Sequence, residues 1–122
     1  MRRTRSDLFF DFNEACTMKQ LRPTELAAHL QTGATPTLLD VREEWEWNTC
    51  KLPGAVHIPL RDLTARVDAF NKADEIVVIC HHGVRSYHAA KFLESLGFTN
   101  VVNLTGGVAA WANEVDPAMP RY

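Results

Sequence analysis

The fold of this chain is decided by one continuous stretch, Ile76-Val77-Val78-Ile79-Cys80-His81-His82-Gly83-Val84-Arg85-Ser86. Its first four residues are β-branched and apolar, which predicts a short buried strand. From Ser86 onward apolar residues recur at helical spacing, so a tight turn must join the strand to a helix. A cysteine therefore lies where a strand ends, and open α/β sheets bind their ligands at the carboxyl ends of their strands.

We expect the loop 80–86 to make Cys80 a nucleophile. The N–H groups of the loop and of the helix start face the sulfur and favour its thiolate. Gly83 allows the backbone to approach a ligand closely. Arg85 carries a fixed positive charge at a helix start, which favours an anionic partner, either a substrate or an internal carboxylate. The plainer interpretation of Cys80 is a buried structural cysteine, but it leaves the rest of the loop unexplained.

Two histidines follow the cysteine directly. His81 and His82 either donate hydrogen bonds to a substrate and titrate near neutral pH, or are simply exposed. We do not expect this pair to hold a metal, because neighbouring residues in a tight turn diverge and the sequence offers no evident third ligand.

Strands and helices alternate along the rest of the chain, which predicts a parallel sheet covered on both faces, a three-layer α/β/α fold. We expect strands at residues 19–21, 37–41, 55–58, 76–79 and 101–104. We expect helices at residues 23–32, 43–48, 60–71, 86–96 and 106–111. The domain is placed at residues 18–122, preceded by an extension of unknown role at 1–17.

A second set of polar residues ends a neighbouring strand at the same edge of the sheet. We expect Asp40 to accept N–H bonds from the active loop and Arg42 to pair with a nearby glutamate. Both residues then support the site and take no part in the chemistry. The pair Gly106-Gly107 indicates a tight turn into a helix, since two glycines alone do not make a phosphate-binding fingerprint.

Composition restricts the classes of function. The chain has 122 residues, enough for one domain, and a net charge of −2, which argues against a nucleic-acid surface. Its three cysteines, Cys16, Cys50 and Cys80, are an odd number without paired spacing, which argues against a disulfide framework. They fit a reducing compartment, so we expect a cytoplasmic protein. No apolar run approaches the roughly 20 residues of a membrane span, and we expect no membrane partner.

Four segments in this order and spacing resemble the rhodanese family of sulfurtransferases in its single-domain form. They are Asp40-Val41-Arg42, Pro53-Gly54-Ala55-Val56-His57-Ile58-Pro59, the loop from Cys80 to Ser86, and Gly106-Gly107-Val108-Ala109-Ala110-Trp111. The resemblance implies a five-stranded parallel sheet, a nucleophile at Cys80 in the loop after the fourth strand, and no metal or organic cofactor. It also implies a substrate-binding loop made of His81, His82, Gly83, Val84, Arg85 and Ser86.

Loop length separates two chemistries that share this fold. Phosphatases of the fold have five residues between cysteine and arginine, whereas four lie between Cys80 and Arg85. The resemblance thus implies a sulfurtransferase that forms a persulfide on Cys80. Its donor is a small anion such as thiosulfate, and its acceptor is cyanide, a thiol or a sulfur-carrier protein.

Three alternatives stay open at this point: a phosphatase or arsenate reductase, a binding module without enzymatic activity, and a sulfur relay with little turnover of small molecules. The chain departs from the family pattern at Cys50-Lys51-Leu52, where Gly-His-Ile is usual. This departure places a second thiol, that of Cys50, near the site.

Overall fold

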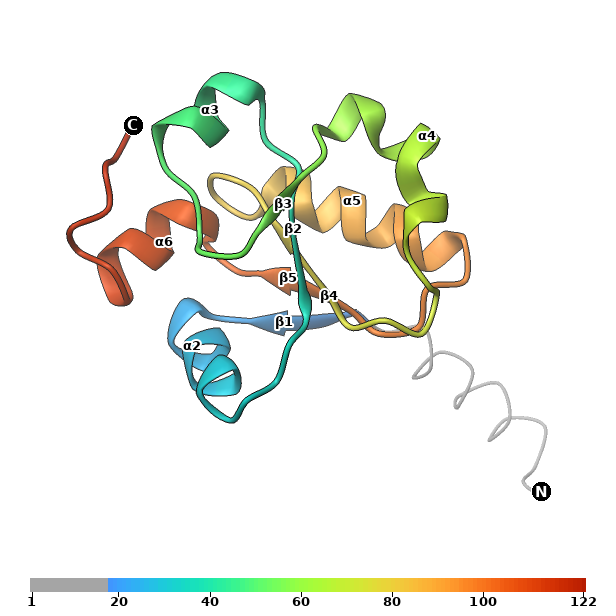
Figure 1. Cartoon of the computed structure of the whole chain (residues 1–122), viewed down its shortest axis with the longest axis horizontal. Coiled ribbons are helices and arrows are strands. Elements are labelled where there is room, and N and C mark those ends of the chain that lie inside the picture. Colours follow the sequence, from blue (N-terminus) through green and yellow to red (C-terminus); the bar gives the residue numbers. More distant parts are fainter. Residues whose placement is uncertain (1–17) are drawn as a thin grey trace.

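The computed structural model describes residues 18–122, in which a five-stranded parallel sheet lies between two layers of helices (Figure 1). The predicted three-layer α/β/α fold is therefore confirmed. The strand order is β1-β5-β4-β2-β3. The strands are β1 (Lys19–Leu21), β2 (Thr37–Asp40), β3 (Val56–His57), β4 (Ile76–Ile79) and β5 (Val101–Leu104). The predicted extension at residues 1–17 lies outside the described residues.

Helices cover both faces of the sheet (Figure 1). One face carries α2 (Pro23–Gln31) and α6 (Gly107–Glu114), which contact each other. The other face carries α4 (Leu63–Arg66) and α5 (Val84–Ser95), while α3 (Glu44–Thr49) follows the carboxyl end of β2. None of the helices in residues 18–122 has the length and apolar content that crossing a membrane requires.

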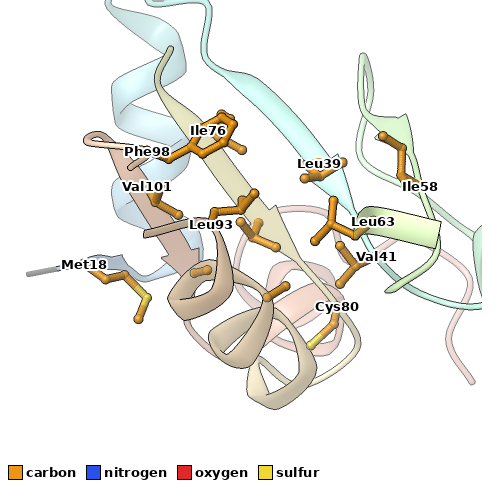
Figure 2. Close-up of a cluster of buried hydrophobic side chains, with 13 residues drawn as sticks. Met18, Leu39, Val41, Ile58, Leu63, Ile76, Cys80, Leu93, Phe98 and Val101 are labelled. Atoms are coloured by element: carbon orange, nitrogen blue, oxygen red, sulfur yellow. The ribbon is translucent and has the colours of Figure 1, made fainter. Parts of the chain in front are cut away.

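Strand β4 lies at the centre of the sheet and supplies both hydrophobic clusters. Ile76 and Val78 pack in the cluster beneath α5, and Val77 and Ile79 pack in the cluster beneath α2 and α6. All four side chains are fully buried, because a central parallel strand is covered on both sides. Figure 2 shows the α5-side cluster, with Cys80 at one end of it.

The predicted helix at residues 60–71 is wrong in detail. The segment consists of a 3-10 turn η1 (Leu60–Asp62), the single-turn α4, and a second 3-10 turn η2 (Val67–Ala69). Its apolar face is nevertheless as predicted, since Leu63 is buried and Val67 and Phe70 pack against the same cluster. Val67 and Phe70 have modest helix propensity, which favours short turns over one continuous helix in this segment.

Candidate active site

Cys80 lies directly after β4, and its sulfur takes the place of a helix cap. The residue is buried, with 1% of its surface exposed. Its Sγ accepts hydrogen bonds from the backbone N–H of Gly83 at 3.0 Å and of Ser86 at 3.3 Å. An N-cap side chain normally accepts the bond from the N–H of the third helical residue, here Ser86, but the N-cap of α5 is Gly83, which has no side chain. The sulfur therefore faces the positive end of the α5 dipole.

The start of α6 bonds to the carbonyl groups of Cys80 and His81. The N–H groups of Val108 and Ala109 donate to the carbonyl oxygens of Cys80 at 2.9 Å and His81 at 3.0 Å. The approach is close enough to require glycine at position 107. A Cβ atom there would lie 2.4 Å from both carbonyl oxygens, and φ is +62°. The turn predicted at Gly106-Gly107 thus fixes the backbone of the active loop.

Gly83 has a backbone conformation that favours glycine. Its φ is +96°, in the left-handed region, and an added Cβ would lie 3.0 Å from the backbone nitrogen of Gly106. The chain can therefore turn back sharply and direct the Gly83 N–H at the sulfur. Val84, the first residue of α5, is 64% exposed, so its side chain faces solvent at the rim of the loop.

Two side chains extend the contacts of Cys80 into the core. The thiol is 3.3 Å from Ser86 Oγ, and the Ser86 hydroxyl donates to Asn103 Oδ1 at 2.5 Å. Asn103 is a buried amide in β5, between apolar neighbours. Our sequence analysis missed it. The signal was present, because a lone amide in a buried apolar strand must find hydrogen-bond partners.

Arg85 pairs with an internal carboxylate, which is one of the two alternatives the sequence left open. Its guanidinium donates two bonds to Glu46 on α3, at 2.7 and 2.8 Å. These bonds lower the pKa of Glu46 to about 2, although burial of the carboxylate alone would raise it. Glu46 was not singled out from the sequence, because Glu43 and Glu44 lie in the same short segment and nothing local distinguishes the three.

The expectations for Asp40 and Arg42 need correction. Asp40 accepts its bonds from Arg42, with Nε at 2.9 Å and Nη2 at 2.7 Å, and not from the active loop. The carboxylate partner of Arg42 is accordingly Asp40 and not a glutamate. Both side chains are fully buried, and a buried carboxylate two residues away is the nearest group that can neutralise the arginine. Burial lowers the pKa of Arg42, but the bonds to Asp40 and Tyr122 outweigh it and raise the pKa above its usual value.

The two ion pairs are joined by Tyr122, which sequence analysis did not connect with the site. Its hydroxyl accepts a bond from Arg42 Nη1 and donates one to Glu46 Oε2, both at 2.9 Å. Burial raises the pKa of Tyr122 to about 12, so the hydroxyl keeps its proton. Tyr122 lies 76 positions from Glu46, and no local pattern indicates such a contact.

The two histidine rings of the loop lie close together instead of diverging, and His81 stacks on Tyr122. The ring of His81 lies 3.9 Å from that of His82 and 4.0 Å from that of Tyr122, measured between centroids. Burial and the neighbouring His82 lower the pKa of His81, so it is neutral at physiological pH. Within residues 18–122 there is no group of three metal-ligating side chains.

A cavity of about 150 Å³ opens beside the histidines. Cys50 is among its lining residues, so the second thiol lies near the loop as the sequence suggested. It packs, however, in the cluster beneath α6, whereas Cys80 packs in the cluster beneath α5. The cavity is lined by Cys50, His81, His82, Val108, Ala109, Ala112, Asn113, Pro120, Arg121 and Tyr122.

This arrangement suits covalent chemistry on one sulfur atom, because a buried thiol receives N–H donors at a helix start. Comparison with known families assigns residues 22–114 to the rhodanese-like domain. The chain belongs to the rhodanese family. This rhodanese-like domain is 34% identical over 100 residues to the putative sulfurtransferase YtwF of Bacillus subtilis, a match that covers 82% of this chain and 96% of YtwF.

Longer relatives contain the domain as one part. The putative sulfur carrier protein YrkF of Bacillus subtilis is 40% identical over 79 residues, which are 65% of this chain but only 43% of YrkF. Among solved structures, a rhodanese-like domain protein from Staphylococcus aureus superimposes with a TM-score of 0.75 and 32% identity, over 80% of this chain and 95% of that one. A Rhodopseudomonas palustris protein described as a possible tyrosine phosphatase shares the fold at 22% identity.

Proposed function

We propose that this protein is a sulfurtransferase that moves a sulfane sulfur from a donor such as thiosulfate to a thiophilic acceptor through a persulfide on Cys80. The observation that carries the proposal is the pair of N–H bonds to Cys80 Sγ from Gly83 and Ser86, at the start of α5. Relatives named sulfurtransferase and sulfur carrier support the same class of reaction.

In the first step the Cys80 thiolate attacks the outer sulfur of thiosulfate. A new S–S bond forms at Cys80, the S–S bond of thiosulfate breaks, and sulfite leaves with that electron pair. The persulfide now carries its negative charge on the outer sulfur. N–H groups of the loop stabilise this sulfur as an oxyanion hole stabilises oxygen.

In the second step a nucleophilic acceptor attacks the outer sulfur. With cyanide, a C–S bond forms, thiocyanate departs, and the electron pair of the broken S–S bond returns to Cys80 as thiolate. No net oxidation or reduction is needed, because one sulfur atom passes unchanged in oxidation level from donor to acceptor. A covalent intermediate of this kind gives ping-pong kinetics.

Arg85 assists this chemistry in two ways. It holds the loop in place, and the positive charge that Glu46 does not fully neutralise attracts the anionic donor. Its bonds to Glu46 fix the start of α5 against α3, and its side chain is still 38% exposed. The bonds to Glu46 raise the pKa of Arg85 above its usual value, so the guanidinium stays charged. Asp40 and Arg42 support the site through Tyr122, which accepts a bond from Arg42 and stacks on His81 of the loop. We place the reaction in the cytoplasm, where thiols stay reduced.

The test is a steady-state assay of thiocyanate formation with thiosulfate and cyanide varied together. We expect parallel lines in the double-reciprocal plot and no thiocyanate from the Cys80→Ser protein. Intersecting lines would contradict a persulfide intermediate. Hydrolysis of an aryl phosphate by the parent, lost in Cys80→Ser, would instead support the phosphatase alternative.

A sulfur relay with little turnover of small molecules is the second candidate. It is favoured by relatives whose names include sulfur carrier and adenylyltransferase/sulfurtransferase, in which a matching domain forms part of a longer chain. A relay predicts that the donor loads Cys80 once, with release of about one equivalent of sulfite. Cyanide and small thiols then discharge the persulfide only slowly, so thiocyanate forms slowly from the start.

A further inference from the structure

Asn103 is an unusual residue at its position in the sheet. It lies in β5, where Val101, Val102 and Leu104 are all buried and apolar, and only 2% of its own surface is exposed. A buried amide is costly unless its donors and acceptor are all used. Its contacts therefore indicate why β5 contains a polar residue here.

The amide has only one orientation that satisfies its neighbours. Asn103 Nδ2 donates to the carbonyl oxygen of Gly83 and to Gln20 Oε1, both at 3.2 Å. Both partners are acceptors, so the nitrogen must face them and Oδ1 must face Ser86. The Ser86 hydroxyl has a single proton, and it donates that proton to Asn103 Oδ1 at 2.5 Å.

This orientation determines what Ser86 presents to the nucleophile. With its proton directed at Asn103, the hydroxyl turns its oxygen lone pairs toward Cys80 Sγ, 3.3 Å away. A neutral thiol can donate its proton to that oxygen. A thiolate faces the lone pairs of an oxygen that has no proton left to offer, and this contact is unfavourable.

We propose that Asn103 is a positioning residue that, through Ser86, holds resting Cys80 in the thiol form and so sets the pH at which Cys80 becomes reactive. The network opposes the two backbone N–H donors, which favour the thiolate. It is compatible with a persulfide, because the charge then lies on the outer sulfur and not on Sγ. The proposal rests on Cys80 being the nucleophile of the proposed function.

Other titratable or charged groups belong to the elements around Cys80. They are His81 and His82 on the same loop, Arg85 on α5, and Glu46 on α3 behind Arg85. None of them bonds to Asn103 or to the Ser86 hydroxyl. Changes at position 103 therefore leave these groups in place. Asn103→Leu also removes the bond to the carbonyl oxygen of Gly83, so a Ser86→Ala background is needed to isolate the Ser86 contact.

The test is the pH dependence of the rate at which iodoacetamide alkylates Cys80 in the full chain, followed by mass of the Cys80 peptide. In Asn103→Leu the Ser86 proton is free to turn toward the sulfur. A hydrogen bond to a charged group is gained, so we expect the midpoint of the alkylation profile to fall by about one pH unit. In Asn103→Asp the Ser86 proton is still accepted, and we expect a midpoint at or above that of the parent.

A double-mutant cycle distinguishes positioning from a general structural effect. In a Ser86→Ala background there is no hydroxyl to redirect, so Asn103→Leu is expected to leave the midpoint unchanged. Equal shifts in both backgrounds, or midpoints lowered in both Asn103 variants, would overturn the proposal. Should Asn103→Leu fail to fold, the Asn103→Asp profile alone decides, since a lowered midpoint there contradicts the proposed orientation. No sulfur donor enters the assay, so its outcome is separate from that of the sulfur-transfer assay.

Discussion

Replacing Glu46 by glutamine tests the electrostatic support of the active loop. Glu46 accepts two bonds from Arg85, one from the N–H of Glu43 and one from the hydroxyl of Tyr122. Glutamine keeps one acceptor oxygen, but its NH₂ group cannot accept from the guanidinium. The carboxylate has a pKa of about 2 in the folded protein, against an ordinary value of 4.5. That difference corresponds to at most about 3–4 kcal/mol of stability at neutral pH.

Solvent reduces this figure, because the Arg85 side chain is 38% exposed. We therefore expect Glu46→Gln to lower the free energy of unfolding by about 1–2 kcal/mol near pH 7. The pKa of Glu46 is depressed on folding, so its contribution is fully present above about pH 4.5. It is lost as the pH falls toward about 2. The difference between parent and variant must shrink over that range.

Urea unfolding followed by tryptophan fluorescence, at about pH 7 and again at about pH 3, measures both effects. Glu44→Gln is the matched control, since Glu44 lies on the same helix and is exposed. It is expected to change stability by less than about 0.5 kcal/mol. A Glu46→Gln deficit of equal size at both pH values, or no deficit near pH 7, would refute the reasoning.

Two further substitutions, at Gly107 and Tyr122, test the contacts that hold the loop 80–86 in place. Gly107→Ala is expected to destabilise the protein by more than about 2 kcal/mol and to abolish thiocyanate formation, because the new Cβ meets the carbonyl oxygens of Cys80 and His81. Gly33→Ala is the matched control, because φ is +92° there but an added Cβ meets no atom within 4 Å. It has only the backbone penalty and should stay active. Equal falls in melting temperature for Gly107→Ala and Gly33→Ala would contradict the role of the close contact at Gly107. Tyr122→Phe should cost about 1–2 kcal/mol in urea unfolding while Cys80 still forms its persulfide. Unchanged stability would mean that the Tyr122 hydroxyl contributes nothing.

The central strand and the position of Cys80 at its end were predictable from the sequence for a local reason. The apolar run Ile76 to Ile79 followed by Cys80 and Gly83 defines a strand, a turn and a helix start within eleven residues, 76–86. Each of these depends on neighbours along the chain, so one sequence is enough to infer them. The broken helix at 60–71 was less predictable, because its apolar spacing fits a continuous helix equally well.

The side-chain partners of the site were not predictable in the same way. Arg85 was recognised as needing an anion, but the choice of Glu46 depends on how α3 packs against α5. The assignment of Arg42 to a glutamate failed because Asp40, two residues away, reaches it when both are buried. Tyr122 joins both ion pairs from the far end of the chain. Among the side chains that our sequence analysis missed, only Asn103 could have been recognised from the sequence, because it is the one amide in an apolar strand.

The most direct test of the central claim is the mass of the protein after incubation with thiosulfate without reductant. We predict one added sulfur atom on the Cys80 peptide, absent from the Cys80→Ser protein and removed by cyanide. No added mass on folded, reduced protein would contradict thiosulfate as the donor. Sulfur added only at Cys50 or Cys16 would contradict Cys80 as the nucleophile.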